Sequence, residues 1–304
     1  MIARRSRVDR CTGTFSTVIR LDAATVLLQW AVGGMAFCWF TTRRRLAGLG
    51  YGWLLRIIYL AMAVGAFLAG VAFGAVPLRE AAAIGVALGC LLALIVSIAC
   101  RRAGVRGQRA EHARRSARVA AMTGIDRAPV DARDAAQRGP EFPPVLDLVP
   151  VAIGVVGLVA AALDAGGSTS VAVLRTLAGA AFIGAVTDAM LLGHWYLVQP
   201  GLPRSLLHEL VDAAVWTWPV EVISLLLPTG MISVLTGDVD DGWGGVLGWF
   251  WVACAIATIV LLLVTKAALR EPQYSAVMAA TGLLYLAILT AFGTDMVARA
   301  VLSG

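Results

Sequence analysis

The chain has 304 residues, of which 59% are apolar and 14% are charged, whereas an average soluble domain has about 45–50% and about 25%. Its mean hydropathy is +0.81 and its net charge is +6. Helices that are apolar on every face are stable only in lipid, so this composition excludes an ordinary soluble globular protein. It predicts an all-α fold, a polytopic transmembrane helix bundle that is surrounded by the lipid bilayer.

Runs of about 20 mostly apolar residues predict about eight membrane-spanning helices. In chain order they are 23–42, 53–71, 81–100, 148–163, 171–198, 206–227, 244–264 and 274–292. The fourth run is short and begins near Pro150, so it extends further at one end or the other. The arginine-rich start leads into a full-length span without an A-x-A-like site, so we expect no cleaved signal peptide. A true start near Val18 would leave only a short tail.

Basic residues collect in alternate connections between these spans. Those connections carry Arg43 to Arg45, ten arginines between residues 101 and 145, Arg204, Lys266 and Arg270. The connections on the other side carry Arg79 and an acidic turn with Asp238, Asp240 and Asp241. By the positive-inside rule we expect the basic connections in the cytoplasm and both termini outside, in the plasma membrane.

The longest basic connection divides the chain into three parts. These are an N-terminal three-span unit (1–100), a cytoplasmic basic loop (101–145) and a C-terminal five-span unit (146–304). The loop has ten arginines against five acids, a net charge of +5. Residues 105–122 predict a basic helix on the membrane surface, and the proline-rich residues 124–144 predict a flexible linker. We expect the loop to contact anionic lipid and not nucleic acid.

Polar residues inside spans are costly and therefore informative, and they concentrate in the fifth and sixth spans. The predicted polar site of this hairpin, near the cytoplasmic face, comprises Asp188, His194, Tyr196, His208, Glu209, Asp212 and Glu221. We expect its acids and imidazoles to face the bundle interior. One helical turn separates His208 from Asp212, so that carboxylate is placed to orient the imidazole. Pro219 should kink the sixth span beside Glu221.

Three functions fit this hairpin. In the first, it serves a redox or quinone-associated subunit, with His194, His208, Trp195 and Trp216 as contacts for a quinone or a haem. In the second, Asp188, Asp212 and Glu221 line the proton or cation path of a small-solute transporter. In the third, the protein is a structural or accessory subunit whose buried acids pair with the polar groups of a partner membrane protein or with its own.

Other charged and reactive residues carry no functional prediction. Arg56, Arg175 and Arg299 lie near span ends, and we interpret them as side chains that snorkel toward water or pair locally. The five cysteines form no CxxC pair, and the sequence has no phosphate-binding glycine loop, HExxH motif or serine nucleophile elbow. We therefore predict no metal site.

Overall fold

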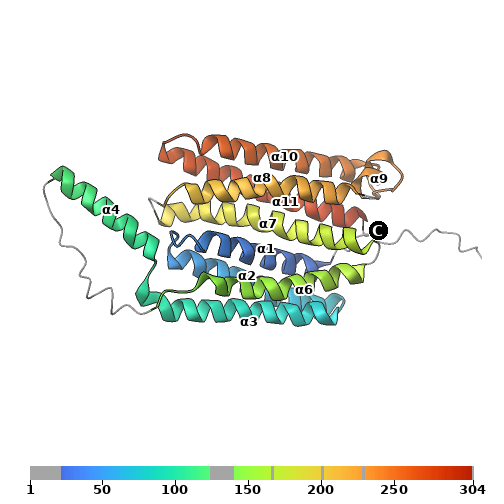
Figure 1. Cartoon of the computed structure of the whole chain (residues 1–304). Helices are drawn as coiled ribbons and strands as arrows, with labels where there is room; N and C mark the ends of the chain where they lie inside the picture. Colours follow the sequence, from blue (N-terminus) through green and yellow to red (C-terminus); the bar gives the residue numbers. More distant parts are fainter. Residues whose placement is uncertain (1–21, 124–139, 166–167, 200–201, 228–229, 303–304) are drawn as a thin grey trace, which may run out of the picture.

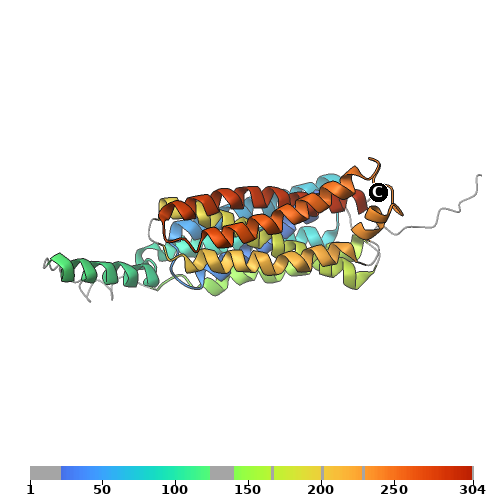
Figure 2. The same cartoon turned by 90° about the horizontal axis from the view of Figure 1, so that it is seen from above.

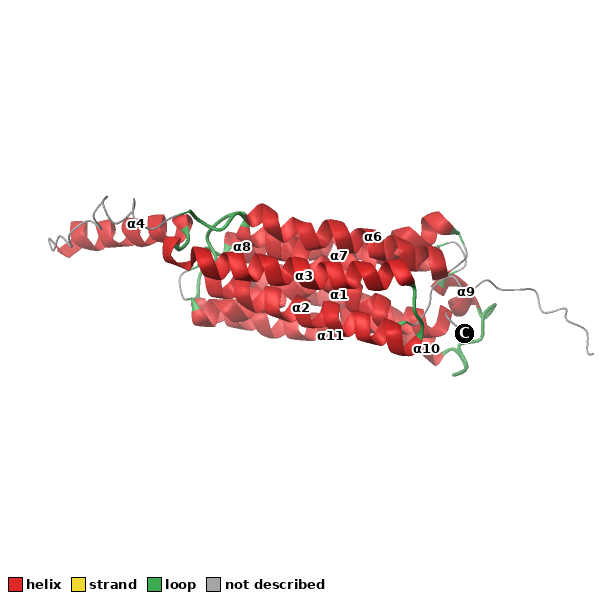
Figure 3. Ribbon diagram, turned by 90° about the horizontal axis from the view of Figure 1, so that it is seen from below, coloured by secondary structure: helices red, strands yellow, loops and turns green. Residues whose placement is uncertain are grey.

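The computed structural model describes residues 22–123, 140–165, 168–199, 202–227 and 230–302. These residues form helices and connecting segments only (Figure 3). The long helices lie side by side in one bundle (Figure 1): α1 (Ala23–Thr42), α2 (Leu49–Phe73), α3 (Pro77–Ala99), α6 (Leu148–Ala165), α7 (Thr169–Val198), α8 (Ser205–Leu226), α10 (Val246–Ala268) and α11 (Tyr274–Leu302). The predicted all-α transmembrane bundle is confirmed.

Seven of these helices are long and apolar enough to cross a membrane, and α8 is the exception. Helix α8 carries the three acids Glu209, Asp212 and Glu221, which make it too polar to be recognised by composition alone. It nevertheless has 22 residues and packs along α7 within the bundle. The arrangement is therefore consistent with about eight spans, and the chain is a multi-pass membrane protein.

Four further elements complete the described fold: η1 (Cys100–Ala103), α4 (Arg106–Thr123), η2 (Pro144–Asp147) and α9 (Met231–Thr236). The predicted basic helix is present as α4, but it projects beyond the end of the bundle, as both views show (Figures 1 and 2). Most of the predicted linker (124–144) and the possible start at Val18 lie outside the described residues.

Six of the eight spans are longer than the sequence predicted, and α2 and α11 exceed their predictions most. Helix α2 begins at Leu49 and not at residue 53, and α11 continues to Leu302, ten residues beyond the predicted end. The charges that follow residue 292 do not end α11 because Arg299 Nε donates a hydrogen bond to Asp295 Oδ2 one turn earlier, at 2.8 Å, and both side chains are buried. Paired charges of this kind can remain inside a bundle at a much lower cost than unpaired ones.

Helices α1 and α7 form the centre of the bundle. In each, 61% of the apolar span is buried, against 33–39% in the other five apolar spans. Helix α1 packs on α2, α6 and α7, and α7 also packs on α8 and α11. Small residues bring the two central backbones together: a Cβ on Gly33 would lie 1.8 Å from the carbonyl oxygen of Ala180. The bundle is continuous across the predicted boundary at residue 146, because α6 packs on α3 and α1.

The connections divide between two ends of the bundle. At one end lie α4 and the described connecting residues 43–48, 100–105, 140–147, 202–204 and 269–273, and at the other lie 74–76, α9 and the end of α11 (Figure 1). We call these the basic end and the opposite end. The basic connections are therefore together in space, and their cytoplasmic location stays a prediction.

Candidate membrane-embedded acid site

The predicted hairpin exists, but its two deeply buried acids lie apart. Helices α7 and α8 pack along each other, and Asp188 and Glu221 are both fully buried. At 1.5 Å per residue, Asp188 lies about 15 Å from the basic end of α7, whereas Glu221 lies about 24 Å from the basic end of α8. The two carboxylates contact different neighbours, so the hairpin contributes to two polar sites and not to one.

The two histidines of the hairpin do not form a common site. His194 is exposed, and its ring lies edge-on to Tyr285 of α11, with Nδ1 at 3.4 Å from the phenol oxygen. The prediction that His194 faces the interior is therefore wrong, because the face of α7 that carries it is turned toward Tyr285 of α11 and the outside of the bundle. His208 is half-buried, and among the described residues no contact joins the two imidazoles.

The acids near the start of α8 form ion pairs at partly exposed positions. Glu209 pairs with Arg44 and Asp212 pairs with Lys266, each at 2.7 Å. The partner of Asp212 is therefore a lysine on α10, and the expected pairing with His208 is not found among the described contacts. These two pairs connect the helix ends of the bundle.

The aromatic residues of the hairpin have structural contacts. The Tyr196 hydroxyl donates to the carbonyl of Pro203 at 2.6 Å, which holds the turn between α7 and α8. Trp195 lies 6.0 Å from the Tyr51 ring and donates from Nε1 to Gln199. Trp216 is 76% exposed, so it faces away from the bundle. None of the three lines a buried pocket with a histidine.

Glu221 is the buried acid with the fewest partners. Its side chain is fully buried, and neither carboxylate oxygen has a hydrogen-bond partner among the described residues. The nearest charged groups are Asp295 and Arg299 of α11 and Arg175 of α7. Helix α8 runs through Pro219 to reach this point. Proline lacks an N–H, so the carbonyl one turn earlier also loses its helical donor.

A second carboxylate faces Glu221. Asp295 is 1% exposed, and its Oδ1 has no hydrogen-bond partner in the described part of the chain. A Cβ on Gly179 of α7 would lie 3.5 Å from Glu221 Oε1 and 3.4 Å from Asp295 Oδ1, so these two oxygens are at most about 7 Å apart. Gly179 therefore leaves room for both carboxylates on the same side of α7.

Gln29 of α1 completes this cluster and connects it to the central helix. Its Nε2 donates to the carbonyl of Thr176 at 2.8 Å, and its Oε1 accepts from Arg299 Nη2 at 2.5 Å. The amide thereby holds the Arg299 guanidinium, which also binds Asp295. The cluster joins α1, α7, α8 and α11.

Arg175 connects the same cluster to the end of α8. Its Nε donates to the carbonyl of Ser224 at 2.7 Å, and its Nη2 donates to the carbonyl of Leu227. A cation at these carbonyls is favourable because the C-terminal end of a helix carries partial negative charge. Arg56, Arg175 and Arg299 are at most 2% exposed, so the interpretation that they snorkel toward water is wrong. Arg299 does pair locally, with Asp295.

Three further polar pairs lie toward the basic end. The Tyr59 hydroxyl of α2 donates to Oδ1 of Asp188, and Trp30 Nε1 donates to Thr187 at 2.8 Å. Closer to the basic end, Arg56 binds Asp147 through two hydrogen bonds of 2.7 Å. These side chains and the acid cluster are distributed along the length of the bundle.

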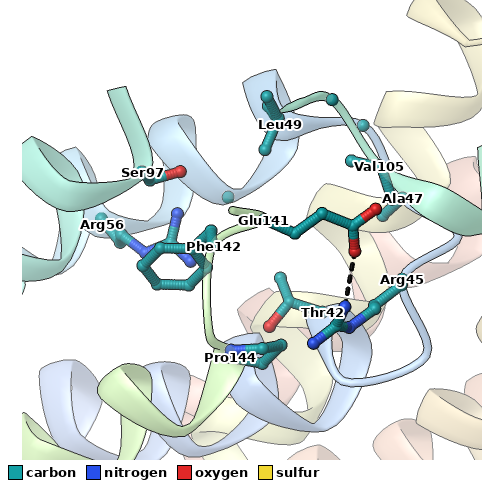
Figure 4. Close-up of a pocket in the computed structure, with 13 residues that line it drawn as sticks. Thr42, Arg45, Ala47, Leu49, Arg56, Ser97, Val105, Glu141, Phe142 and Pro144 are labelled. Carbon is teal, nitrogen blue, oxygen red and sulfur yellow. Dashed lines mark hydrogen bonds and ion pairs between the residues drawn. The ribbon is translucent and has the colours of Figure 1, made fainter. Parts of the chain in front are cut away.

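A small pocket opens beside Arg56 at the basic end (Figure 4). It has a volume of about 40 Å³, enough for a few waters, and lies between α1, α2, α3 and the segment before η2. The Phe142 ring covers the Arg56 guanidinium at 4.3 Å, and the Glu141 carboxylate accepts from Arg45 at 2.5 Å. The pocket wall is therefore partly charged and partly apolar.

Sequence reasoning missed most of the residues that face the buried acids. Gln29, Tyr59 and Asp147 were not among the predicted site residues, and Asp295 and Arg299 were assigned to the region beyond the last span. The spacing of Asp295 and Arg299 was the one available signal, since residues four apart share a helix face. Within the described residues no group of three or more His, Cys, Asp or Glu side chains is placed to hold a metal ion.

No known protein family matches this chain, and no curated protein or solved structure matches it.

Proposed function

We propose that this protein is a proton-coupled membrane transporter of small solutes, in which Glu221 and Asp295 bind and release the coupling proton. The observation that carries the proposal is the Glu221 carboxylate, which is fully buried with both oxygens unpartnered among the described residues. A second carboxylate oxygen with no hydrogen-bond donor lies at most about 7 Å away.

Electrostatics favours a proton as the ligand of this pair. An ionised carboxylate that receives no hydrogen bond in a dry interior destabilises the folded protein by several kcal/mol. Such a group therefore indicates a functional role. A proton bound to either acid removes the repulsion between two like charges in low dielectric. With both acids ionised, Arg175 and Arg299 balance them, so the cluster alternates between neutral and singly positive. A change of one unit in the net charge of the cluster is small enough for a bound solute or a helix movement to compensate.

The redox interpretation has less support. It needs the two imidazoles or the aromatic rings to surround one cofactor, whereas His194 is exposed beside Tyr285 and Trp216 faces outward. The structural or accessory-subunit interpretation needs each buried acid to have a polar partner, on this chain or on another protein. Asp147, Asp188 and Asp295 receive such hydrogen bonds from this chain. Glu221 receives none among the described residues, and the proton-coupled proposal accounts for it.

We also propose the plasma membrane as the location, with the basic end in the cytoplasm. The positive connections gathered at that end support this orientation. Helix α4 carries its arginines beyond the bundle, and we propose that it contacts anionic lipid headgroups there.

Proton flux in proteoliposomes tests the function. The full-length protein is reconstituted with a pH-sensitive dye inside and a clamped membrane potential, and a pH step is applied with and without a panel of amino acids, sugars, organic acids and inorganic cations. We expect at least one solute to accelerate the flux. Glu221→Gln and Asp295→Asn should slow it at least about tenfold, because a positioned proton carrier is lost.

Glu209→Gln is the matched control, since Glu209 is an acid of the same helix in a partly exposed ion pair. It should leave the flux unchanged. A flux no faster than in protein-free liposomes with every solute, or a Glu221→Gln variant as fast as the wild type, would contradict the proposal.

A further inference from the structure

Asp188 is a buried acid that the Glu221 and Asp295 cluster does not use. It is fully buried on the central helix α7, its Oδ1 accepts from the Tyr59 hydroxyl, and its Oδ2 has no hydrogen-bond partner among the described residues. The titratable groups that face it are Tyr59 and Tyr51 of α2 and Cys38 of α1. These contacts include no arginine or lysine, in contrast to Asp147, which is bound by Arg56.

A tightly packed layer separates Asp188 from the cluster near Gly179. Asp188 is nine positions after Gly179 in the sequence, which corresponds to about 13.5 Å along α7. Within that distance a Cβ on Gly184 would lie 2.3 Å from the carbonyl carbon of Gly33, so the backbones of α1 and α7 are in direct contact. No water fits between backbones at this separation. The two acid sites therefore lie on either side of a dry contact.

Access to Asp188 is shorter from the basic end. Tyr59 lies one turn beyond Arg56 on the same face of α2, and Arg56 and Gly52 line the pocket of about 40 Å³ (Figure 4). A few waters in that pocket would lie beside Arg56, which is about one helical turn from Tyr59 along α2.

We propose that Asp188 is a second proton-binding residue of this membrane protein, supplied from the basic end through the pocket and the Tyr59 hydroxyl. In the loading step the O–H bond of Tyr59 breaks as its proton moves to Asp188 Oδ1, and the phenol oxygen takes a proton from a hydronium ion, which remains as water. Release runs the same bonds in reverse. The inference rests on the proposed proton coupling. Asp188 is then the proton-binding site on the basic side of the Gly33–Gly184 contact, and Glu221 is the proton-binding site on the opposite side.

The flux assay on full-length protein tests the inference, with infrared difference spectra between acid and alkaline pH as a second readout. Asp188→Asn keeps the shape of the side chain but not its proton, so flux should fall at least about tenfold and one protonated-carboxyl band should disappear. Tyr59→Phe should slow flux and shift the Asp188 band without removing it. Glu221→Gln should remove a different band.

A bulky thiol reagent tests the route. In a Cys11→Ser, Cys100→Ser background, Leu49→Cys places a thiol in the pocket wall, and Leu235→Cys places one on α9 at the opposite end. Labelling Leu49→Cys should slow proton loading at least about tenfold, and labelling Leu235→Cys should have no effect on this step.

The outcomes separate the two proposals. Wild-type flux and an unchanged carboxyl spectrum for Asp188→Asn, together with slow flux for Glu221→Gln, would overturn the inference and leave the proposed function standing. Wild-type flux for Glu221→Gln would overturn the proposed function itself. If Asp188→Asn fails to fold, Tyr59→Phe decides: wild-type flux with an unshifted band would overturn the inference.

Discussion

Arg56 of α2 and Asp147 of η2 form a bidentate ion pair inside the bundle, with Nε to Oδ1 and Nη2 to Oδ2 both at 2.7 Å. Thr42 at the end of α1 donates a third hydrogen bond, to Asp147 Oδ2 at 3.2 Å. Arg56 is 2% exposed and Asp147 is fully buried, so the pair fixes the segment before α6 against α1 and α2. The segment between the two halves of the chain is thereby anchored at the basic end.

Removal of one partner of this pair should destabilise the protein strongly. Asp147→Ala leaves the Arg56 charge buried without its carboxylate partner. We expect the free energy of unfolding, measured by thermal denaturation in detergent, to fall by about 3–5 kcal/mol. Arg56→Met combined with Asp147→Leu should recover most of it, because an apolar pair carries no desolvation penalty. Glu209→Gln breaks the partly exposed pair with Arg44 and should cost less than about 1 kcal/mol. Equal losses for Asp147→Ala and Glu209→Gln would contradict this account.

Alanine should have opposite effects on stability at Gly184, which lies in the contact between α1 and α7, and at Gly282, which lies outside it. Gly184→Ala places a methyl 2.3 Å from the Gly33 carbonyl carbon, so the helices must separate at a cost of about 1–3 kcal/mol. Gly282 of α11 has no atom within 4 Å of its would-be Cβ, and Gly282→Ala should stabilise the protein by about 0.5–1 kcal/mol through helix propensity. Melting temperatures of the two variants in the same detergent check the signs. Stabilisation by Gly184→Ala would show that the backbones are not in contact.

Asp241 should make the start of α10 sensitive to acid. Its Oδ1 accepts from the amides of Gly245 and Trp243, and its Oδ2 from those of Leu247 and Gly248. These donors, chiefly Gly245, lower the pKa of the Asp241 carboxyl below its ordinary value. The ionised Asp241 carboxylate therefore stabilises the start of α10 fully above about pH 4. This stabilisation is lost as the pH falls through the lowered pKa.

Amide hydrogen exchange at residues 245–248 measures this effect. Protection should decrease in acid in the wild type, and Asp241→Asn should be poorly protected at every pH. Asp240→Asn is the control because Asp240 accepts only from Gly242 in this turn. Acid sensitivity that persists in Asp241→Asn would assign the effect to another group.

Removal of the half-exposed ion pair between Asp212 and Lys266 should have only a small effect on stability. Their exposed fractions are 42% and 37%, so Asp212→Asn should cost less than about 1 kcal/mol and leave proton flux unchanged. Lys266→Met should behave in the same way, and His208→Leu should be tolerated. Loss of flux in Asp212→Asn but not in Lys266→Met would restore the pairing of Asp212 with His208 that the sequence suggested.

Reporter fusions check the membrane orientation. Fusions after Arg45, near Arg118 and after Arg270 should report the cytoplasm, because these positions lie at the basic end, and one near Asp240 should report the outside. A cytoplasmic signal at Asp240 would contradict the eight-span arrangement.

The sequence alone determined the class of the protein and the position of its spans. A run of about 20 apolar residues has no stable environment except lipid or a large core, so each span is a local property of the chain. The alternation of Arg43 to Arg45, Arg204 and Arg270 with acidic connections likewise assigned each connection to one end. The helix ends depended on tertiary contacts as well. Helix α11 extends beyond its predicted end because Asp295 and Arg299 neutralise each other inside the bundle.

Only the tertiary structure decided which polar residues meet. The partner of each buried acid comes from the helix that packs beside it: Tyr59 lies 129 residues from Asp188, Arg56 lies 91 residues from Asp147, and the Gln29 that holds Arg299 lies 270 residues away. A buried charge must be compensated, but the sequence does not say which neighbour compensates it. Helix order in the bundle, set by close contacts such as Gly33 with Gly184, made Glu221 and Asp295 one site and placed His194 on the outside.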